Sequence, residues 1–266
     1  MSTQLEKILA HTRAEVKDRR AVSDLSLLER RAAAHQPRGF EAGLRRVAAH
    51  GPAVIAELKK ASPSRGLIRG DFQPAELARS LETAGAAALS VLTDQTFFQG
   101  SLENLERASA EVKIPCLRKD FIVDPFQILE ARASGADAIL LIVAALSDSD
   151  LRSLSEEAEV IGLDVLCEIH DRDELERANA LGFSVIGVNS RNLHTMEVQP
   201  QTQIELGQWL PQTAVRVAES GIRTRADIAL MAAAGYDAFL IGESLMRQAD
   251  PAAALAGLLQ REYSPR

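Results

Sequence analysis

From residue 50 onward, short apolar runs alternate along the chain with longer stretches in which apolar residues recur at helical spacing. The apolar runs contain few polar positions, which is typical of strands buried on both faces of a parallel sheet. The predicted strands span residues 53–57, 87–92, 114–119, 138–143, 164–169, 184–189, 214–219 and 238–242. The predicted helices span residues 74–84, 101–111, 126–134, 148–161, 171–181, 199–208, 224–234 and 251–260.

Turn residues support these boundaries, because a helix commonly ends at a glycine and begins after a polar cap. Glycines precede several predicted strands, at Gly85, Gly135 and Gly235. Polar caps precede several predicted helices, at Ser147, Asp171 and Thr224.

Eight strand–helix units of one period predict an α/β fold, the (β/α)8 TIM barrel. The alternative is a doubly wound open sheet. That fold would normally show a glycine-rich turn for a dinucleotide after its first strand, and no GxGxxG follows any predicted strand here. The pattern therefore favours the barrel.

The residues before the first strand predict a helical extension. Helices are expected over residues 4–20, 27–34 and 40–49, with Ser26 capping the second and Glu29 in its capping-box position.

The expected organisation is an extension of residues 1–50 packing on a barrel of residues 51–266, as one structural domain. Packing is favoured over a solvated appendage because the apolar faces of the helices need cover. The extension is also expected to close over the mouth of the barrel.

Composition narrows the class of protein. The length of 266 residues and the 46% apolar content fit one large α/β domain. A net charge of −7 argues against nucleic acid as the main partner, and no apolar run is long enough for a membrane span or a signal peptide. Cys116 and Cys167 lie in apolar runs, which predicts reduced thiols in a cytoplasmic protein, and no Cys/His cluster indicates zinc.

Polar side chains follow most of the predicted strands at the point where each strand ends. In a TIM barrel these ends converge on one face, where the active site is built. Charged residues at the end of one strand are readily explained by a structural role. Acids and bases at the ends of most strands, all at the same level, predict a site for one small molecule. The strand-end residues are Glu57, Lys59, Thr93, Asp94, Arg118, Lys119, Asp120, Glu168, His170, Asn189, Ser190, Arg191, Asn192, Glu219, Ser220, Gly221, Gly242, Glu243 and Ser244.

The last two strand ends differ from the others, because Ser220-Gly221 and Gly242-Glu243 are small-residue turns that enter helices. Backbone N–H groups at such turns bind phosphate, and TIM barrels commonly place a phosphate site after strands seven and eight. The alternative interpretation is an ordinary strand–helix turn, which also favours Gly and Ser.

Several motifs resemble the indole-3-glycerol-phosphate synthase family. They are ELKKASPSRG (57–66), LRKDFIVDPFQI (117–128), LCEIH (166–170), IGVNSRNL (186–193), VAESGI (217–222) and FLIGESLM (239–246), and PRGF (37–40) resembles that family's extension. The resemblance covers essentially the whole chain. ELKKASPS and KDFIVDPFQI are specific, whereas AESGI and IGES are shared with other phosphate-binding barrels.

The resemblance implies a carboxy-lyase of tryptophan biosynthesis. It would convert 1-(2-carboxyphenylamino)-1-deoxyribulose 5-phosphate, an anthranilate-ribulose phosphate, to indole-3-glycerol phosphate, carbon dioxide and water. An iminium formed during ring closure would accept the electrons released with carbon dioxide, so no cofactor and no metal is expected. This small-molecule substrate is the only expected partner. A monomer is expected, with a homodimer as the alternative.

The resemblance assigns roles to individual positions. Lys119 matches the family's general acid for ring closure, and Glu168 matches the residue that acts as acid or base in dehydration. Lys59 resembles the lysine that contacts the substrate carboxylate and can itself transfer a proton. Glu57 would orient the lysines, and Asn189 would bond the reacting hydroxyls. The division of acid and base roles among Lys59, Lys119 and Glu168 stays open.

The remaining positions are binding contacts. Arg191 resembles the family's arginine that faces the substrate carboxylate. Glu219 and Ser220 fall at the substrate contact after strand seven, and Glu219 is also counted among the catalytic residues. Ser62 and Phe121 match positions at the sugar-phosphate end and the anthranilate ring.

The phosphate positions are Gly221, Gly242 and Glu243. The chain departs from the family pattern at two places. Ala61 stands where some members carry Lys, so Lys60 or Arg65 is expected to supply that charge. Glu243 stands where others carry Ser, and because a carboxylate repels phosphate, its side chain is expected to point away while its N–H binds.

Two other functions are weighed against the synthase. A barrel resembling phosphoribosylanthranilate isomerase would need a Cys/Asp pair at opposite strand ends, but Cys116 lies within a predicted strand. A barrel that only binds a ligand would lack a key acid or base, and none is missing. The histidines are expected on the surface or in loops, and only His170 follows a strand end closely enough to reach the site.

Overall fold

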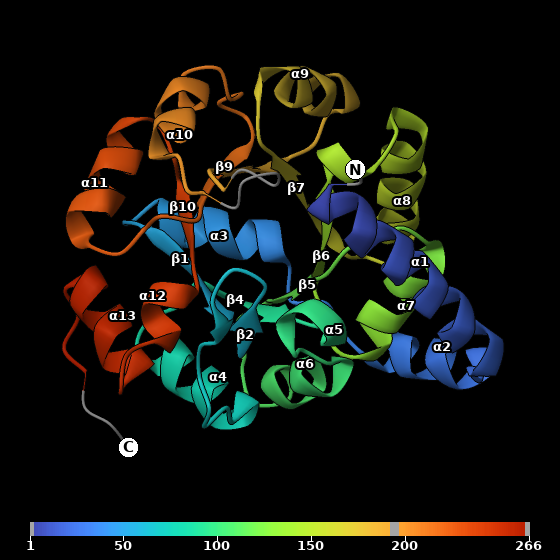
Figure 1. Ribbon diagram of the computed structural model, residues 1–266. Coiled ribbons are helices and arrows are strands. Elements are labelled where there is room, and N and C mark those ends of the chain that lie inside the picture. Colours follow the sequence, from blue (N-terminus) through green and yellow to red (C-terminus); the bar gives the residue numbers. More distant parts are fainter. Residues whose placement is uncertain (1–2, 192–196, 264–266) are drawn as a thin grey trace.

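The structure is a computed structural model that describes residues 3–191 and 197–263. Within these residues, eight parallel strands close into a barrel (Figure 1). They are β1 (Ala53–Leu58), β4 (Ala88–Leu92), β5 (Cys116–Lys119), β6 (Ala138–Ile142), β7 (Asp164–Ile169), β8 (Val185–Asn189), β9 (Val215–Glu219) and β10 (Ala238–Ile241). The predicted TIM barrel is confirmed, and the open sheet is wrong.

A ring of helices surrounds the strands in Figure 1. It contains α4 (Pro74–Thr83), α6 (Leu102–Ser109), α7 (Pro125–Ala133), α8 (Asp148–Val160), α9 (Arg172–Leu181), α10 (Pro200–Gly207), α11 (Arg225–Ala233) and α13 (Pro251–Leu259). Short elements that the sequence did not predict follow several strands: β2 (Ala61–Ser62), β3 (Gly66–Leu67), α5 (Gln95–Phe98), the 3-10 turn η1 (Val143–Ala145) and α12 (Glu243–Met246). The loops at the carboxyl ends of the strands are therefore more ordered than expected.

The helix caps agree with the sequence, with one exception. Ser147, Asp171 and Thr224 accept hydrogen bonds from the first turns of their helices. The exception is α2 (Leu25–Ala34), which is capped by Asp24 and not by Ser26. The Asp24 carboxylate accepts a bond of 3.0 Å from the N–H of Leu27, so the helix begins before the predicted position and Glu29 is not in a capping box.

The barrel strands alternate between an inner and an outer core, and this alternation brings the acids and bases together. On β1, Ala53 and Ile55 belong to the inner core, whereas Val54 and Ala56 belong to the outer one. Glu57 is the next inward position because side chains on a strand repeat every two residues. On three other strands the inner residues Leu117, Leu166 and Val217 are followed two positions later by Lys119, Glu168 and Glu219. The apolar interior thus ends in a polar layer at the mouth.

Helix α3 (Phe40–Ala48) closes the opposite end of the barrel. Its Phe40 and Leu44 are fully buried in the inner core. The segment before α3 is anchored by Arg38, whose N–H and Nε donate to Asp137 at 2.7 and 2.8 Å. Asp137 is fully buried immediately before β6, so this contact holds the PRGF segment against the barrel.

Helix α1 (Gln4–Val22) runs along the barrel and reaches its mouth (Figure 1). His11 Nε2 lies 2.8 Å from Thr96 Oγ1 in α5, and Arg19 donates two bonds of 3.0 Å to the carboxylate of Glu130 in α7. No helix in the described ranges is both long and apolar enough to cross a membrane.

Candidate active site

A cavity of about 550 Å³ opens at the carboxyl ends of the barrel strands. Every residue to which the resemblance gave a catalytic or binding role borders it: Glu57, Lys59, Ser62, Lys119, Phe121, Glu168, Asn189, Arg191, Glu219, Ser220, Gly221, Gly242 and Glu243. The strand-end residues Thr93, Arg118, His170 and Ser190 are not part of its described lining. Leu5 and Ile8 of α1 border it as well, so the extension forms part of its wall. Asn192 and His194 lie outside the described residues.

Lys119 lies between two buried carboxylates. Its Nζ donates to Glu168 Oε2 at 2.6 Å and to Glu219 Oε2 at 2.7 Å. Burial alone would lower the pKa of Lys119, but the charges of Glu168 and Glu219 raise it above its usual value. The ammonium is therefore protonated at neutral pH.

The two carboxylates have different proton affinities. Burial favours the neutral form of both, but Lys119 and His170 together bring the pKa of Glu168 below its usual range. Burial and the charge of Glu168 raise the pKa of Glu219 to about 7, against the opposing effect of Lys119. Two carboxyl groups whose pKa values are pushed apart are typical of an acid–base pair.

Two glycines make room for carboxylates of this layer. A methyl group at Gly187 would overlap with Oε1 of Glu219, and one at Gly242 would overlap with Oε1 of Glu57. Glu57 forms an ion pair with Lys59, two residues further along the chain. Glycine is therefore required at both positions for these carboxylates to lie where they do.

The turn after β9 is held in an unusual backbone conformation. Ser220 has φ of 69°, in the left-handed region that non-glycine residues seldom adopt, and Gly221 follows with φ of 78°. The Ser220 hydroxyl donates to Asn189 Oδ1 at 2.8 Å, and the N–H of Arg191 donates to the same oxygen at 3.0 Å. These bonds connect the predicted contacts of β8 and β9.

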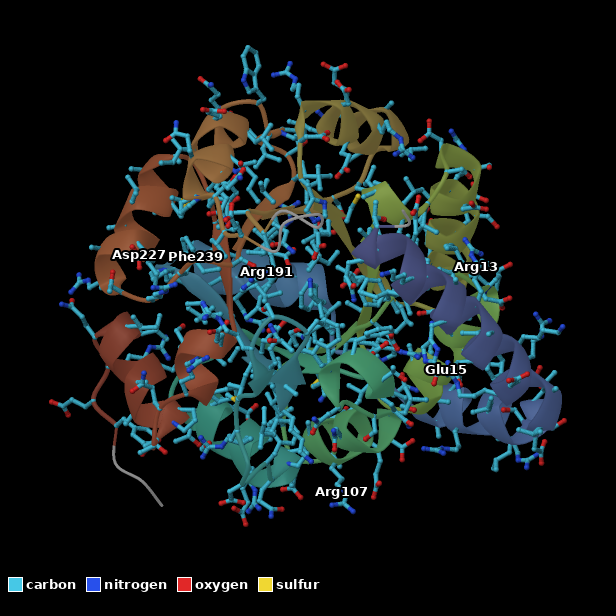
Figure 2. All side chains as sticks on the ribbon, in the orientation of Figure 1. Arg13, Glu15, Arg107, Arg191, Asp227 and Phe239 are labelled. Atoms are coloured by element: carbon cyan, nitrogen blue, oxygen red, sulfur yellow. The ribbon has the colours of Figure 1, made fainter. Side chains whose placement is uncertain are left out.

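Glu243 stands among arginines at the β10 side of the cavity. Its carboxylate lies 3.0 Å from Arg247 Nε, 3.4 Å from Arg65 Nε and 3.9 Å from Arg191 Nη2. Figure 2 shows Arg191 near the centre of the mouth, whereas Arg107 projects from the outer ring of helices. Ala61 cannot supply the positive charge that some family members have at this position. Of the two expected substitutes, Arg65 borders the cavity, whereas Lys60 is not part of its described lining, so Arg65 is the better candidate.

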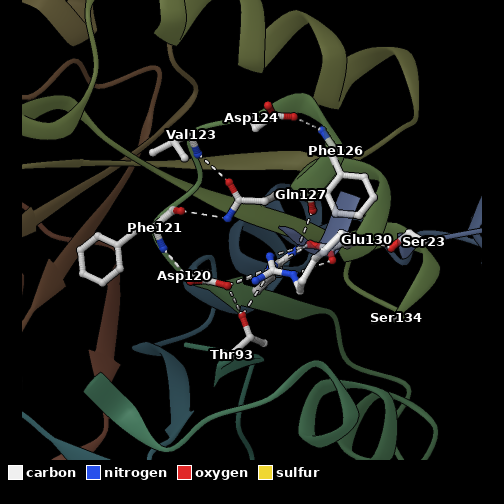
Figure 3. Close-up of polar contacts among 12 residues, drawn as sticks. Ser23, Thr93, Asp120, Phe121, Val123, Asp124, Phe126, Gln127, Glu130 and Ser134 are labelled. Atoms are coloured by element: carbon white, nitrogen blue, oxygen red, sulfur yellow. Dashed lines mark hydrogen bonds and ion pairs between the residues drawn. The ribbon is translucent and has the colours of Figure 1, made fainter. Parts of the chain in front are cut away.

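The loop after β5 is fixed by a second buried network, shown in Figure 3. Asp120 accepts a bond from the N–H of Phe121 at 2.9 Å, and the amide of Gln127 bonds both Phe121 O at 2.9 Å and the N–H of Val123 at 2.8 Å. Asp120 thus caps this loop, and Asp124 caps α7.

Arg118 occupies the centre of this network and is 1% exposed. It donates to Asp120 Oδ2 at 2.8 Å and to Gln127 O at 2.6 Å, and it lies 3.4 Å from Glu130 Oε2. Because Arg19 bonds the same Glu130, the network connects α1 with the strand that carries Lys119.

Sequence reasoning missed several residues at the cavity, among them Leu5, Ile8 and Phe98, whereas the strand-end residue Asp94 borders it as expected. The Phe98 ring lies 6.3 Å from that of Phe121, centroid to centroid. The Phe97-Phe98 pair after the predicted strand 87–92 was an available signal, because only 4% of the chain is aromatic. Cys116 belongs to the outer core and not to the cavity, which counts against an isomerase that uses it.

The chain matches the family model for indole-3-glycerol phosphate synthase over residues 5–258. It is 60% identical over 259 residues to an indole-3-glycerol phosphate synthase from Koribacter versatilis (strain Ellin345), covering 97% of this chain and all of that protein. It is 51% identical over 257 residues to the protein of the same name from Burkholderia vietnamiensis (strain G4 / LMG 22486), covering 96% and 98%.

Among solved structures, thiamine phosphate pyrophosphorylase from Pyrococcus furiosus superimposes with a TM-score of 0.59 at 15% identity, covering 79% of this chain and 94% of that one. A likeness at this identity shows the barrel fold alone. The family is shown by the whole-chain match and by the two relatives. The chain belongs to the indole-3-glycerol phosphate synthase family, the carboxy-lyases that act in tryptophan biosynthesis.

Proposed function

We propose that the cavity binds 1-(2-carboxyphenylamino)-1-deoxyribulose 5-phosphate and that its side chains catalyse ring closure, decarboxylation and dehydration in that order. One observation carries the proposal beyond the family match. The protonated Lys119 is held between two buried carboxylates, of which one favours the ionised form and the other, with a pKa of about 7, can gain or lose a proton near neutral pH. A proton donor beside a proton acceptor is what these steps require.

In ring closure, the ring carbon that bears the substrate carboxylate attacks the ketone carbon, and the ketone oxygen gains a proton. We assign the transfer of this proton to Lys119, which borders the cavity as an ammonium. Glu219, 2.7 Å from its Nζ, is placed to replace the proton that Lys119 gives up.

In decarboxylation, the bond to carbon dioxide breaks and its electron pair moves into the iminium formed by ring closure. In dehydration, the hydroxyl leaves as water after it gains a proton, and the ring loses a proton to a base. Glu168 and Glu219 supply the base and the acid, since both lie beside Lys119 in a layer where water is largely excluded. Asn189 would hold the reacting hydroxyl.

The substrate would lie across the mouth between two different ends. The phosphate would bind backbone N–H groups of Gly221, Gly242 and Glu243, with Arg65 beside them. Glu243 would remain compatible with phosphate because Arg65 and Arg247, which border the cavity with it, offset the negative charge of its carboxylate.

The aromatic ring would pack on Phe121 and on Phe98, which sequence reasoning did not include. The substrate carboxylate would face Lys59 and Arg191. Ser62 has a buried hydroxyl that lacks a hydrogen-bond partner among the described residues, so the substrate can supply one.

The wider organisation is part of the same proposal. Residues 1–50 act as an extension of the barrel domain formed by residues 51–266, and α1 closes over the mouth. Support comes from Leu5 and Ile8, which border the cavity. We further propose a cytoplasmic monomer, in keeping with the two buried unpaired cysteines.

The test is a fluorescence assay in which the purified chain is mixed with the substrate and formation of the indole product is followed. We expect turnover. A folded protein that binds the substrate without forming product would contradict the proposal and favour a ligand-binding barrel.

A further inference from the structure

His170 lies in the loop between β7 and α9, and its ring is enclosed by two carboxylates. Nδ1 lies 3.1 Å from Glu174 Oε2, and Nε2 lies 3.4 Å from Glu168 Oε1. The His170 side chain is 13% exposed. The sequence placed this histidine in a loop near the site, and the structure shows that it contacts the carboxylate that bonds Lys119.

The positions of the two ring nitrogens indicate the protonation state. A neutral imidazole has one N–H donor, so one ionised carboxylate would face a lone pair, whereas an imidazolium has a donor for each. The backbone N–H of His170 also donates to Glu174 Oε2, at 2.7 Å, which fixes that oxygen as an acceptor. Burial opposes a charge on the ring, but Glu168 and Glu174 raise the pKa of His170 to about 10.

The other charged groups on the elements around this loop have partners of their own. On α9, Asp171 caps the helix, and Arg177 donates to Asp148 and to the carbonyl oxygens of Val143 and Leu146. On β7, burial raises the pKa of the Cys167 thiol, so it is neutral. In the described part of the chain, Glu168 and Glu174 are the charged groups that form ion pairs with His170.

The two carboxylates on Lys119 differ in their second contact. Glu168 has Lys119 on Oε2 and His170 on Oε1. Glu219 has Lys119 on Oε2, and its Oε1 is buried without a hydrogen-bond partner in the described part of the chain. A second cation on only one carboxylate makes that carboxylate the weaker base for a shared proton.

We propose that His170 is a positioning residue that, as an imidazolium held by Glu174, keeps Glu168 ionised and leaves the proton of the pair on Glu219. Glu168 is then the base of dehydration, and Glu219 is the acid that protonates Lys119 or the leaving hydroxyl. This assignment rests on the function proposed above. It makes Glu168 the base, where the family resemblance leaves acid or base open, and it gives the role of acid to Glu219.

The pH dependence of kcat tests this role. In His170→Asn the second cation is lost, so Glu168 takes up a proton at higher pH. The acid limb of the kcat profile should then move up by about one pH unit or more, and KM should change far less than kcat. Glu174→Gln should move the limb in the same direction by a smaller amount, because it removes the charge that holds the imidazolium.

The matched control is His35→Asn. His35 lies 3.2 Å from the buried Asp137 at the closed end of the barrel, so it also pairs with a carboxylate but is remote from the cavity. Its pH profile should superimpose on that of the unchanged protein. Profiles of His170→Asn and His35→Asn that both superimpose would overturn the proposal.

A second measurement needs no variant and no turnover. In protein labelled with nitrogen-15 histidine, NMR at pH 8 should show one histidine with both ring nitrogens protonated. Glu174→Gln should weaken or abolish that signature. A neutral His170 at pH 8 would contradict the proposal even if the enzyme is active, whereas an inactive enzyme with a charged His170 would contradict only the proposed function.

Discussion

Arg118 and Lys119 are neighbours on β5, and each is a buried cation among carboxylates. Arg118 points outward into the layer between β5 and α7, where its donors meet Asp120, Glu130 and Gln127 O. Lys119 points inward to the mouth, between Glu168 and Glu219. The same strand therefore carries two charge clusters on opposite faces.

The clusters differ in how completely their polar atoms are paired. Glu219 Oε1, beside Lys119, is buried without a hydrogen-bond partner, and His170 Nε2 has only the 3.4 Å ion-pair contact with Glu168; no unpartnered atom of the described residues belongs to the Arg118 cluster. A fully paired network rigidifies the structure, whereas each unpaired buried group costs about 1–3 kcal/mol. The comparison teaches that unpaired polar atoms, more than buried charge, distinguish the Lys119 cluster, which would bind a ligand, from the Arg118 cluster.

The largest expected effect is on activity, in Lys119→Ala. Loss of a general acid should lower kcat by about a thousandfold. The variant should fold, because Glu168 keeps its contact with His170 and Glu219 can take up a proton. The measurements are the fluorescence assay and binding of a product-like ligand, with Lys113→Ala on the surface as control. Near-normal turnover would remove Lys119 from the mechanism.

One residue earlier, in Arg118→Met, the expected loss is in stability. Asp120 and Glu130 would remain buried with fewer partners, so the free energy of unfolding should fall by about 3–5 kcal/mol. Urea unfolding measures this loss. In the control Arg107→Met, an exposed pair with Glu103 is removed, and the change should stay within about 0.5 kcal/mol. Equal losses in the two variants would show that the buried network has no special role.

A smaller effect is expected where a glycine makes room for a carboxylate. In Gly187→Ala the new methyl group should displace Glu219 from Lys119 and lower kcat by about 10-fold to 100-fold. The control is Gly257→Ala, where an added methyl group meets nothing within 4 Å. If Gly187→Ala leaves kcat unchanged, the position of Glu219 is less critical than the structure indicates.

Local patterns in the sequence predicted the barrel and its polar layer. Buried parallel strands appear as apolar runs, and the residues two positions beyond them, such as Glu57 and Glu168, point into the same interior. The site residues could thus be named before their contacts were known. Their roles in the reaction remain predictions.

Long-range contacts could not be read in this way. Arg19 and Glu130 are 111 positions apart, and nothing local to either residue names the other. Phe98 was missed because its short helix, α5, has too few residues to show a period. Ser26 was predicted as the cap, but Asp suits that position as well as Ser, and only the bond to Leu27 identifies Asp24.

Closure of the barrel has a consequence for synthesis of the chain. β1 pairs with β10, so its edge stays open until the ribosome has made nearly the whole protein. At about 5–20 residues per second, that interval lasts on the order of ten seconds or more. Phe40 and Leu44, which need the finished interior for burial, are exposed during the same time. The nascent chain therefore presents the apolar face of helix α3 and a free strand edge that a chaperone could bind before the last strand arrives.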